Sequence, residues 1–250
     1  MSPVRLRGES VEKRYGRVAA LRGVDFDIAA GESVAILGAN GAGKSSLLKI
    51  LAGLSRPSNG TFEARDAGAA TAPLGREALR ARVGYVGHAT LLYGELTARE
   101  NLAFAARLHG QRPSRSVLDT VLEEFALADV ADRRADTFSR GMAQRLAIAR
   151  AVVHGPSVLL LDEPFTGLDE ASGERLQARL LAQRADGSGG ARTLVVVTHD
   201  PRRAVALADR ALLVHRGRIR ATPVRGDDAF TAEALRERLV ELAASVEAAA

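Results

Sequence analysis

Alternating apolar and polar positions mark the first part of the chain. Three short apolar runs within residues 4–37 (VRLRGESV, VDFDI and SVAILG) are separated by glycines, a pattern that predicts strands joined by turns. A further short strand is expected at VGYVG (83–87). VLLLD (158–162) and TLVVVTHD (193–200) are continuous apolar runs, as expected for parallel strands buried on both faces. The chain is therefore expected to contain an α/β core.

Helical spacing of apolar residues separates these strands. KSSLLKILAGL (44–54) predicts one helix, and residues 97–153 predict a helical region made of TARENLAFAARLHG, SVLDTVLEEFALADV and AQRLAIARAVVHG. The cluster SRPSNG (55–60) indicates a turn, and GSGG (187–190) belongs to a loop rich in glycine and serine. No internal repeat is visible. The helical region is expected to interrupt the α/β core.

Two further elements are expected near the C-terminus. ALLVHRGRIRA (211–221) predicts a hairpin, and TAEALRERLVELAASVEAAA (231–250) predicts an amphipathic or fraying helix. We therefore divide the chain into a domain over residues 1–225 and a C-terminal helix or tail over 226–250. Within the larger domain, a helical subdomain is inserted at about residues 90–153.

Length and composition limit the class of protein. A chain of 250 residues with 46% hydrophobic residues can bury one large or two modest cores. No run reaches the roughly 18 apolar residues that a membrane span needs. The first ten residues lack the apolar core of a signal peptide, so a cytosolic protein is expected. The absence of cysteine excludes disulfides and thiolate metal sites.

The charge of the chain is +5 at neutral pH, from 35 basic and 30 acidic residues. Most basic residues are scattered arginines, and only Lys13, Lys44 and Lys49 are lysines. Aromatic residues make up 4% of the chain, which leaves few platforms for base stacking. A solvated arginine-rich surface is favoured over nucleic-acid binding, and the same charge fits a modest attraction to an anionic membrane surface.

The segment GANGAGKS (38–45) lies between a predicted strand and a predicted helix, which is the context required of a phosphate-binding loop. Its glycines allow successive N–H groups to turn inward as an anion nest, and the helix N-terminus adds its dipole. Lys44 would bring a mobile charge to the β- and γ-phosphates of ATP, and Ser45 a hydroxyl to Mg²⁺. The ATP-binding residues expected here are Gly38, Ala39, Asn40, Gly41, Ala42, Gly43, Lys44, Ser45 and Ser46.

Two strand ends supply the groups expected to act on the nucleotide. VLLLDEP places Asp162 where it can hold Mg²⁺ through a water, and Glu163 where it can act as general base on an attacking water. TLVVVTHD places His199 at a second strand end, where an imidazole could hydrogen-bond the γ-phosphate and orient the water. The catalytic residues expected are Glu163 and His199.

In order and spacing, GANGAGKS, LLLDEP, TGLD (166–169) and VVVTHD resemble the motifs of the ATP-binding cassette (ABC) ATPases, over about residues 4–222. The resemblance implies a P-loop NTPase (RecA-like) core with an antiparallel β subdomain and a helical insert. It implies ATP hydrolysis with Mg²⁺ in a head-to-tail homodimer that drives a separate membrane subunit. Tyr15 looks like the aromatic residue that stacks on adenine, although an ordinary hairpin tyrosine is the alternative.

The stretch FSRGM (138–142) stands where this family usually has LSGGQ, which caps the γ-phosphate of the partner chain's ATP. Ser139 and Gly141 match the hydroxyl and the close-approach backbone of that motif. Arg140 and Met142 replace residues that generally face away from the phosphate. The resemblance therefore implies an altered but working contact to ATP through Ser139 and Gly141.

A second departure is His88, which stands where the family normally carries a glutamine after the strand. Mg²⁺ prefers oxygen ligands and retains its waters, so an imidazole would be a poor direct ligand. Two interpretations stay open: His88 acts on the metal through a water, or it caps the loop.

Together, GHATLLYGELTARENL (87–102) and FSRGMAQRLAIARA (138–151) resemble the ATP-binding subunit of haem or cytochrome c maturation exporters (the CcmA type). This resemblance implies a CcmB-like permease as integral membrane partner and a peripheral location on the cytoplasmic face of the inner membrane. Leu91, Leu92 and Tyr93 are either an apolar docking surface for that partner or part of the core. The alternatives are the ATPase subunit of a drug, lipid or peptide exporter and, less favoured, a cassette ATPase acting on nucleic acid or ribosomes.

Overall fold

Two sheets form the core of the protein. The structure is a computed structural model that describes residues 2–67, 72–185 and 192–244. A three-stranded antiparallel sheet has the order β2-β1-β4, and a six-stranded sheet has the order β5-β6-β7-β3-β8-β9. In the larger sheet only the β8–β9 pair is antiparallel. The strands are β1 (Val4–Tyr15), β2 (Val18–Ile28), β3 (Ser33–Leu37), β4 (Asn59–Asp66), β5 (Val83–Val86), β6 (Val158–Asp162), β7 (Thr193–Val197), β8 (Arg210–His215) and β9 (Arg218–Ala221).

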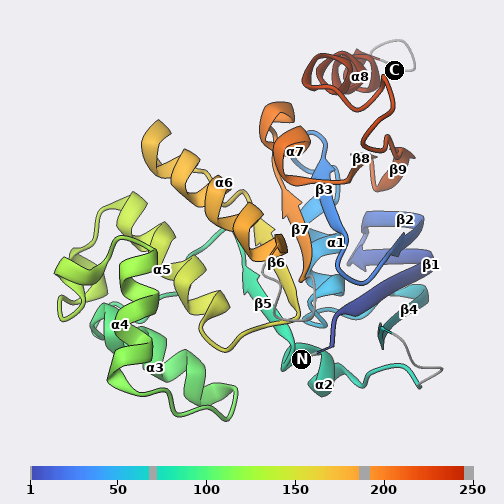
Figure 1. Ribbon diagram of the computed structural model, residues 1–250. Coiled ribbons are helices and arrows are strands. Elements are labelled where there is room, and N and C mark those ends of the chain that lie inside the picture. Colours follow the sequence, from blue (N-terminus) through green and yellow to red (C-terminus); the bar gives the residue numbers. More distant parts are fainter. Residues whose placement is uncertain (1, 68–71, 186–191, 245–250) are drawn as a thin grey trace.

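Helices cover the larger sheet and build a separate lobe. Figure 1 shows α3, α4 and α5 grouped to one side of the sheets, and α8 at the opposite end of the molecule. The helices are α1 (Lys44–Leu51), α2 (Arg76–Arg80), α3 (Ala98–Leu108), α4 (Arg115–Glu124), α5 (Arg140–Val152), α6 (Glu170–Ala185), α7 (Pro201–Leu207) and α8 (Ala232–Ala244), with 3₁₀ turns at Ala128–Val130 and Ala135–Thr137.

The main core lies between the two sheets. Apolar side chains of α1, among them Leu47 and Leu51, pack with Leu6 and Ile28 of the small sheet and with Leu160 of the large one. All five of these residues are fully buried. Because α1 begins directly after β3, this packing fixes the connecting loop against both sheets. A second apolar cluster joins β5, β6 and β7 to the helical lobe, and a third joins β3 and β8 to α7 and α8.

The expected α/β core with an antiparallel sheet and a helical insert is confirmed, with differences in element length and number. The first two strands expected within residues 4–37 are longer than the sequence pattern suggested. They are β1, of twelve residues, and β2, of eleven, which pair as one hairpin with several register shifts. The third is observed as β3 at nearly its expected length. The expected turn at 55–60 ends where β4 begins, at Asn59. The hairpin expected at 211–221 is present as β8 and β9.

The helical region departs from the sequence pattern at its middle helix. Residues 116–130 read as one helix, but α4 ends at Glu124. The chain then turns through Ala126, whose φ of 52° is left-handed and cannot continue a helix. Leu127 is nevertheless buried in the lobe, so the helical spacing of apolar residues in the sequence continues past the end of the helix. Three helices of the lobe start at side-chain caps, Thr97, Ser114 and Ser139, which are ordinary N-cap residues.

Several elements were absent from the expectations. These are β4, α2, α6 and α7. The start of α7 does have a sequence signal, because Asp200 caps it and Pro201 occupies its first turn. The GSGG loop at 187–190 and the tail at 245–250 lie outside the described residues. None of the described helices has the length and apolar character to cross a membrane.

Candidate functional site

The loop between β3 and α1 is shaped by close backbone approach. Gly43 has φ of 108°, and a Cβ there would lie 2.4 Å from the carbonyl oxygen of Ala20. At Gly38, a Cβ would lie 2.1 Å from the carbonyl oxygen of Val214. A side chain at either position would collide with backbone of another strand or turn, so glycine is required. The loop therefore passes tightly between β2 and β8 and delivers Lys44 to the first turn of α1.

Lys44 is buried at this loop, with 8% of its surface exposed. Its Nζ donates hydrogen bonds to the carbonyl oxygens of Gly38 at 2.8 Å and Ala39 at 2.9 Å. Burial lowers the pKa of the ammonium group, and the nearby carboxylates of Glu163 and Asp162 oppose that shift. The ammonium is thus held by the loop and faces two acidic residues.

Those acidic residues lie at the end of β6, a parallel strand that is separated from β3 by β7. Asp162 is the last residue of β6 and is 5% exposed. Glu163 has φ of 51°, a left-handed conformation that is uncommon outside glycine and is one of the strained conformations found at active sites. The Glu163 N–H donates to the carbonyl oxygen of Val197 on β7 at 3.0 Å. This bond holds the turn after β6 against the end of β7.

The pairing of β6 with β7 brings Glu163 and His199 together. His199 Nδ1 lies 2.9 Å from Glu163 Oε2, although the two residues are 36 positions apart in the sequence. The histidine side chain is 77% exposed and the glutamate side chain 20% exposed. Because an ionised carboxylate only accepts, Nδ1 carries the shared proton, and the Nε2 atom is left as an acceptor. The contact orients both side chains.

A cavity of about 450 Å³ collects these groups. It falls in the size range of small-molecule sites, roughly 300–1,000 Å³. Of the residues expected at the site, all but five line this cavity. Its lining residues are Tyr15, Ala20, Asn40, Gly41, Gly43, Lys44, Ser45, Ser46, His88, Asp162, Glu163, Thr166 and His199.

Tyr15 and His88 stand at the exposed part of the cavity. Tyr15 is 48% exposed at the end of β1, and Lys13 Nζ lies 5.1 Å from the centroid of its ring. A ring presented in this way has a face available for stacking. His88 is exposed and has no hydrogen-bond partner within the described part of the chain, so no such bond supports the loop-capping interpretation.

Ser139 and Gly141 do not line the cavity of their own chain. Ser139 is the exposed N-cap of α5, and its Oγ accepts a hydrogen bond from the Met142 N–H at 3.3 Å. The other residues expected to bind ATP that do not line the cavity are Gly38, Ala39 and Ala42, whose loop surrounds Lys44. Ser139 and Gly141 are therefore the expected residues that lie apart from both the cavity and its loop.

Arg140 packs against the loop that follows β6. Its side chain covers Gly167, where a Cβ would lie 2.8 Å from Arg140 Cδ. A Cβ at Gly141 would lie 3.3 Å from the Gly167 carbonyl oxygen, and Gln144 Nε2 donates to the Pro164 carbonyl oxygen at 3.2 Å. The first turns of α5 are therefore packed directly on the segment after Glu163.

Sequence reasoning did not identify this contact or two of the cavity residues. Arg140 was expected only to face away from the phosphate, and Gln144 was not considered. Thr166 and Ala20 line the cavity without having been expected there. Thr166 follows Glu163 by three residues in TGLD, so its position near the acidic pair offered a signal, whereas nothing local marks Ala20.

The donor set of the cavity fits a magnesium ion. The Asp162 carboxylate and the Ser45 hydroxyl both line it, and both are hard oxygen ligands of the kind that Mg²⁺ prefers. No cluster of three or more acidic, histidine or cysteine residues that could hold a metal exists among the described residues. Mg²⁺ needs only one or two protein ligands when phosphate oxygens and water molecules fill the rest of its coordination shell.

Comparison with known families gives a match over residues 21–166 to the family described as "ABC transporter". This span includes the phosphate loop, Ser139, Gly141 and the end of β6 with Glu163. The chain belongs to the ABC transporter family. The fold agrees with this membership: an ABC ATPase domain is a P-loop NTPase, and the expected enzyme class, a transporter ATPase, is confirmed.

Curated relatives of this ABC ATPase domain serve both directions of transport. It is 37% identical over 220 residues to the Nod factor export ATP-binding protein I of Burkholderia orbicola (strain AU 1054), covering 87% of this chain and 69% of that protein. It is 39% identical over 230 residues to the sulfate/thiosulfate import ATP-binding protein CysA of Caulobacter vibrioides (strain ATCC 19089 / CIP 103742 / CB 15), covering 88% of this chain and 65% of that one. It therefore spans about two thirds of the length of these relatives.

Solved structures of cassettes have the same fold. The dimeric post-hydrolysis state of the ATP-binding cassette MJ0796, bound to ADP and Pi, superimposes with a TM-score of 0.76 at 29% identity. That comparison covers 89% of this chain and 100% of the other. The resemblance to ABC ATPases read from the motifs is therefore correct, and the narrower resemblance to haem exporters is not tested by it.

Proposed function

We propose that this ABC ATPase domain binds ATP with Mg²⁺ in the 450 Å³ cavity and hydrolyses it to power a separate membrane subunit. One observation carries the proposal: Lys44, Asp162, Glu163 and His199 come from the ends of three neighbouring parallel strands and meet in one cavity. Ligands of open α/β sheets bind at the carboxyl ends of the strands, which is where these four residues lie.

Binding of the nucleotide depends on the loop Gly38–Ser46 and Tyr15. The loop N–H groups and the N-terminus of α1 form an anion site for the phosphates. Lys44 Nζ exchanges its hydrogen bonds to the Gly38 and Ala39 carbonyls for bonds to phosphate oxygens. These charge-assisted bonds offset the free-energy cost of burying the ammonium group. The exposed ring of Tyr15 stacks on the adenine base.

Ser45 and Asp162 would hold Mg²⁺, Asp162 through a water, and His88 at the cavity mouth would reach the ion only through a water. When bound, the metal neutralises charge on the β- and γ-phosphate oxygens. The buried position of Asp162 at 5% exposure favours a fixed carboxylate at this point.

Hydrolysis depends on the Glu163–His199 pair. Glu163 Oε accepts a proton from the attacking water as the water oxygen forms a bond to the γ-phosphorus and the bond to the ADP oxygen breaks. His199 donates Nδ1–H to Glu163, which fixes the direction of the carboxylate. The exposed Nε2 side of the imidazole is then free to contact the γ-phosphate when it carries a proton.

Two copies of the chain complete two sites in this proposal. Ser139 and Gly141 lie outside the cavity of their own chain and are accessible, so they serve the ATP held by a second copy in a head-to-tail homodimer. The dimeric arrangement of MJ0796 supports such a pairing for this chain. The contact of Arg140 with Gly167 links this partner-facing turn to the loop after Glu163.

A second groove, of about 380 Å³, suits a membrane partner. Its rim carries four exposed apolar side chains: Leu54 at 49%, Leu91 at 65%, Tyr93 at 49% and Leu108 at 70% exposure. Leu92 instead packs against the core of the lobe. Within residues 91–93, the core interpretation therefore applies to Leu92 and the docking interpretation to Leu91 and Tyr93. We propose Leu91 and Tyr93 as docking residues for an integral permease, with the chain on the cytoplasmic face of the inner membrane.

We propose haem export for cytochrome c maturation, with a CcmB-like permease, as the transport task. Support comes from the combination of His88 after β5 and Arg140 in the FSRGM stretch, the variants shared with CcmA-type subunits. The alternative is another exporter, for drugs, lipids or peptides, and the curated relatives named above fit a wide range of cargo. Cargo contacts would lie on the permease.

Two measurements test these proposals separately. Phosphate release by the purified chain, measured with and without Mg²⁺, tests the ATPase, and absence of Mg²⁺-dependent release from an ATP-binding preparation contradicts it. Deletion of the gene in its host, followed by haem staining of c-type cytochromes, tests the cargo. Normal cytochrome levels in the deletion strain would exclude haem export and leave the exporter alternatives.

A further inference from the structure

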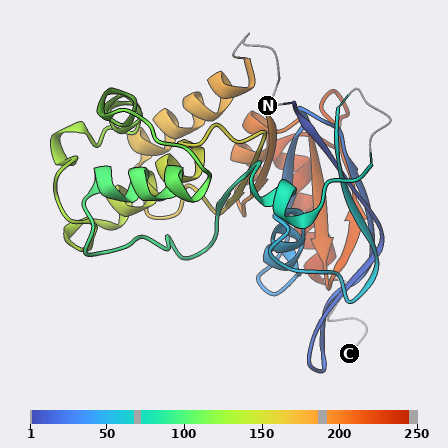
Figure 2. The ribbon, with the colours of Figure 1, turned by 90° about the horizontal axis from the view of Figure 1, so that it is seen from below.

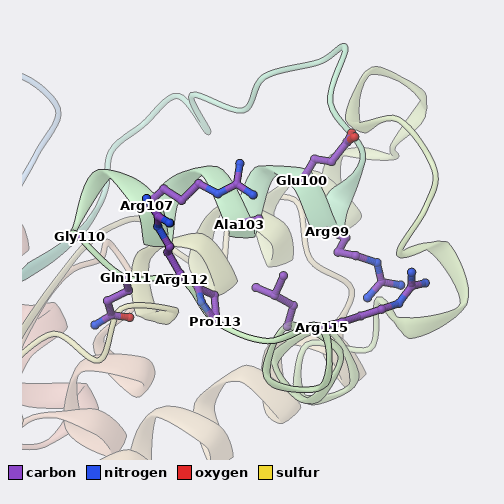
Figure 3. A pocket seen from close by; sticks show the side chains of 10 residues that line it. Arg99, Glu100, Ala103, Arg107, Gly110, Gln111, Arg112, Pro113 and Arg115 are labelled. Carbon is purple, nitrogen blue, oxygen red and sulfur yellow. The ribbon is translucent and has the colours of Figure 1, made fainter.

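A groove of about 790 Å³ runs along the outer side of the helical lobe, remote from the nucleotide cavity. Four arginines line it: Arg99 and Arg107 from α3, Arg112 from the following loop, and Arg115 from α4. Figure 3 shows Arg107 and Arg112 at one end and Arg99 and Arg115 at the other. Ala103, Pro113 and Leu118 give the groove an apolar surface between these ends.

The two ends of the groove differ in free charge. Arg99 donates to Asp132 at 2.9 Å and is also paired with Asp119, and Arg115 lies 3.6 Å from Asp132. These pairs neutralise that end. The side chains of Arg107 and Arg112 have no hydrogen bond or ion pair within the described part of the chain, and both residues are exposed. The uncompensated positive charge is therefore concentrated at Arg107 and Arg112.

The acidic residue that lines the groove does not cancel this charge. Glu100 accepts a hydrogen bond from the Thr97 N–H at 2.8 Å in a capping box at the start of α3. It lies nearly two helical turns from Arg107, which leaves the charge of Arg107 unpaired. The structural role of Glu100 also explains its presence in a cationic groove.

We propose that Arg107 and Arg112 form a binding site for the phosphate of anionic phospholipid headgroups. Guanidinium groups bind phosphate oxygens in bidentate geometry, and two of them here have no competing partner. An extended acidic peptide fits less well, because the other end of the groove is neutralised by its own ion pairs and offers no free cation to a second acidic residue. The groove has no aromatic lining residue, so bases of nucleic acid have no stacking surface.

The neighbouring surface fits a membrane rather than a free phosphate compound. Leu108 directly follows Arg107, is 70% exposed at the end of α3, and stands on the rim of the groove proposed to dock the permease, so Arg107 adjoins the side of the chain proposed to face the membrane. Basic residues beside an exposed apolar side chain are typical of segments that lie at an anionic membrane surface. In Figure 1, α3 lies at the edge of the molecule, well separated from α8, and Figure 2 shows the helical lobe to one side of the sheets. The site would thus hold one face of the helical lobe against the bilayer.

The inference extends the proposed membrane location of the chain, and its test uses vesicles without any permease, so it fails independently of docking or hydrolysis. The full chain is sedimented with vesicles of phosphatidylcholine alone and with vesicles containing phosphatidylglycerol. We expect the wild type to bind the anionic vesicles, and Arg107→Glu/Arg112→Glu to bind them at least tenfold more weakly. The matched control is Arg218→Glu/Arg236→Glu, two exposed arginines of β9 and α8 whose reversal changes the net charge equally, and the expected change is less than twofold.

Arg107→Gln/Arg112→Gln is the milder variant, expected to lose an intermediate part of the binding with an unchanged melting temperature. Equal binding of the wild type to both kinds of vesicle would overturn the proposal. Equal weakening by Arg218→Glu/Arg236→Glu would also overturn it, because the attraction would then be non-specific. Displacement of the protein by millimolar glycerol phosphate would assign the site to a soluble phosphate compound. Displacement by an acidic peptide alone would assign it to a protein partner.

Discussion

The phosphate loop and the first turn of α5, the two regions proposed to contact ATP, differ in how far the chain itself encloses them. The loop Gly38–Ser46 is enclosed by its own chain, with Lys44 buried and bonded to two loop carbonyls. The α5 turn with Ser139 and Gly141 is accessible and lies outside that cavity. In the proposed mechanism, one chain therefore holds the groups for nucleotide binding and base catalysis, and its α5 turn contacts the nucleotide of a second copy.

The largest expected effect tests the enclosed half. Glu163→Gln keeps the shape of the side chain and the loop but removes the base. We expect ATP binding to be retained while phosphate release falls about 100- to 1,000-fold, within the range for loss of a general base. Binding and release are measured on the same preparation. Glu170→Gln, at the exposed start of α6, is the matched control and should keep full activity. Near-normal turnover of Glu163→Gln would remove Glu163 from the role of base.

The second prediction tests whether the exposed half serves another chain. Lys44→Ala and Gly141→Asp should each be nearly inactive, the first for lack of phosphate charge and the second because a carboxylate blocks close approach. Random mixing makes about half of the dimers mixed, with one sound site in two, so activity should recover to about a quarter of wild type if each site turns over alone.

The recovery is best measured in the complex with the proposed membrane partner, which would hold the two copies together. In a control mixture of Lys44→Ala with Glu163→Gln, each mixed dimer has one lesion in the cavity of each chain, so no sound site forms and no recovery is expected. If the Lys44→Ala and Gly141→Asp mixture stays inactive as well, the shared-site arrangement is wrong.

His88 gives a smaller effect at the edge of the enclosed half. If it acts through a water, His88→Gln should keep its activity, since an amide can hold the same water. His88→Ala should lose about tenfold, the factor expected for one hydrogen bond of about 1.4 kcal/mol. Initial rates at saturating ATP and Mg²⁺ distinguish the two variants. Equal rates for alanine and glutamine would exclude the water-mediated role.

The smallest effect concerns the contact that joins the two halves. Arg140→Gly would uncover Gly167 and add a flexible residue to the first turn of α5, which costs about 1 kcal/mol in a helix. We expect a loss of about two- to fivefold in turnover, from looser packing on the segment after Glu163. Arg140→Met keeps an apolar stem over Gly167 and should stay near wild type. If methionine is as damaging as glycine, the guanidinium charge matters and the packing does not.

Local sequence was sufficient for the enclosed half. GANGAGKS lies in one stretch, and its strand, loop and helix follow directly from apolar spacing and glycine positions, so Lys44 and Ser45 could be placed before the structure was known. Strand ends at Asp162 and His199 were marked by continuous apolar runs. The early end of α4 was not predictable in this way, because Leu127 continues the apolar period beyond the left-handed turn at Ala126.

The sequence by itself determined which groups the site would contain: a phosphate loop, two acidic residues after one strand and a histidine after another. Only the tertiary structure decided which of them meet. The 2.9 Å contact between Glu163 and His199 exists because β6 pairs with β7, and the packing of Arg140 on Gly167 exists because α5 lies across the turn after β6. Such contacts join residues far apart in the chain, and side-chain periodicity reports only which face of an element is buried, never which other element covers it.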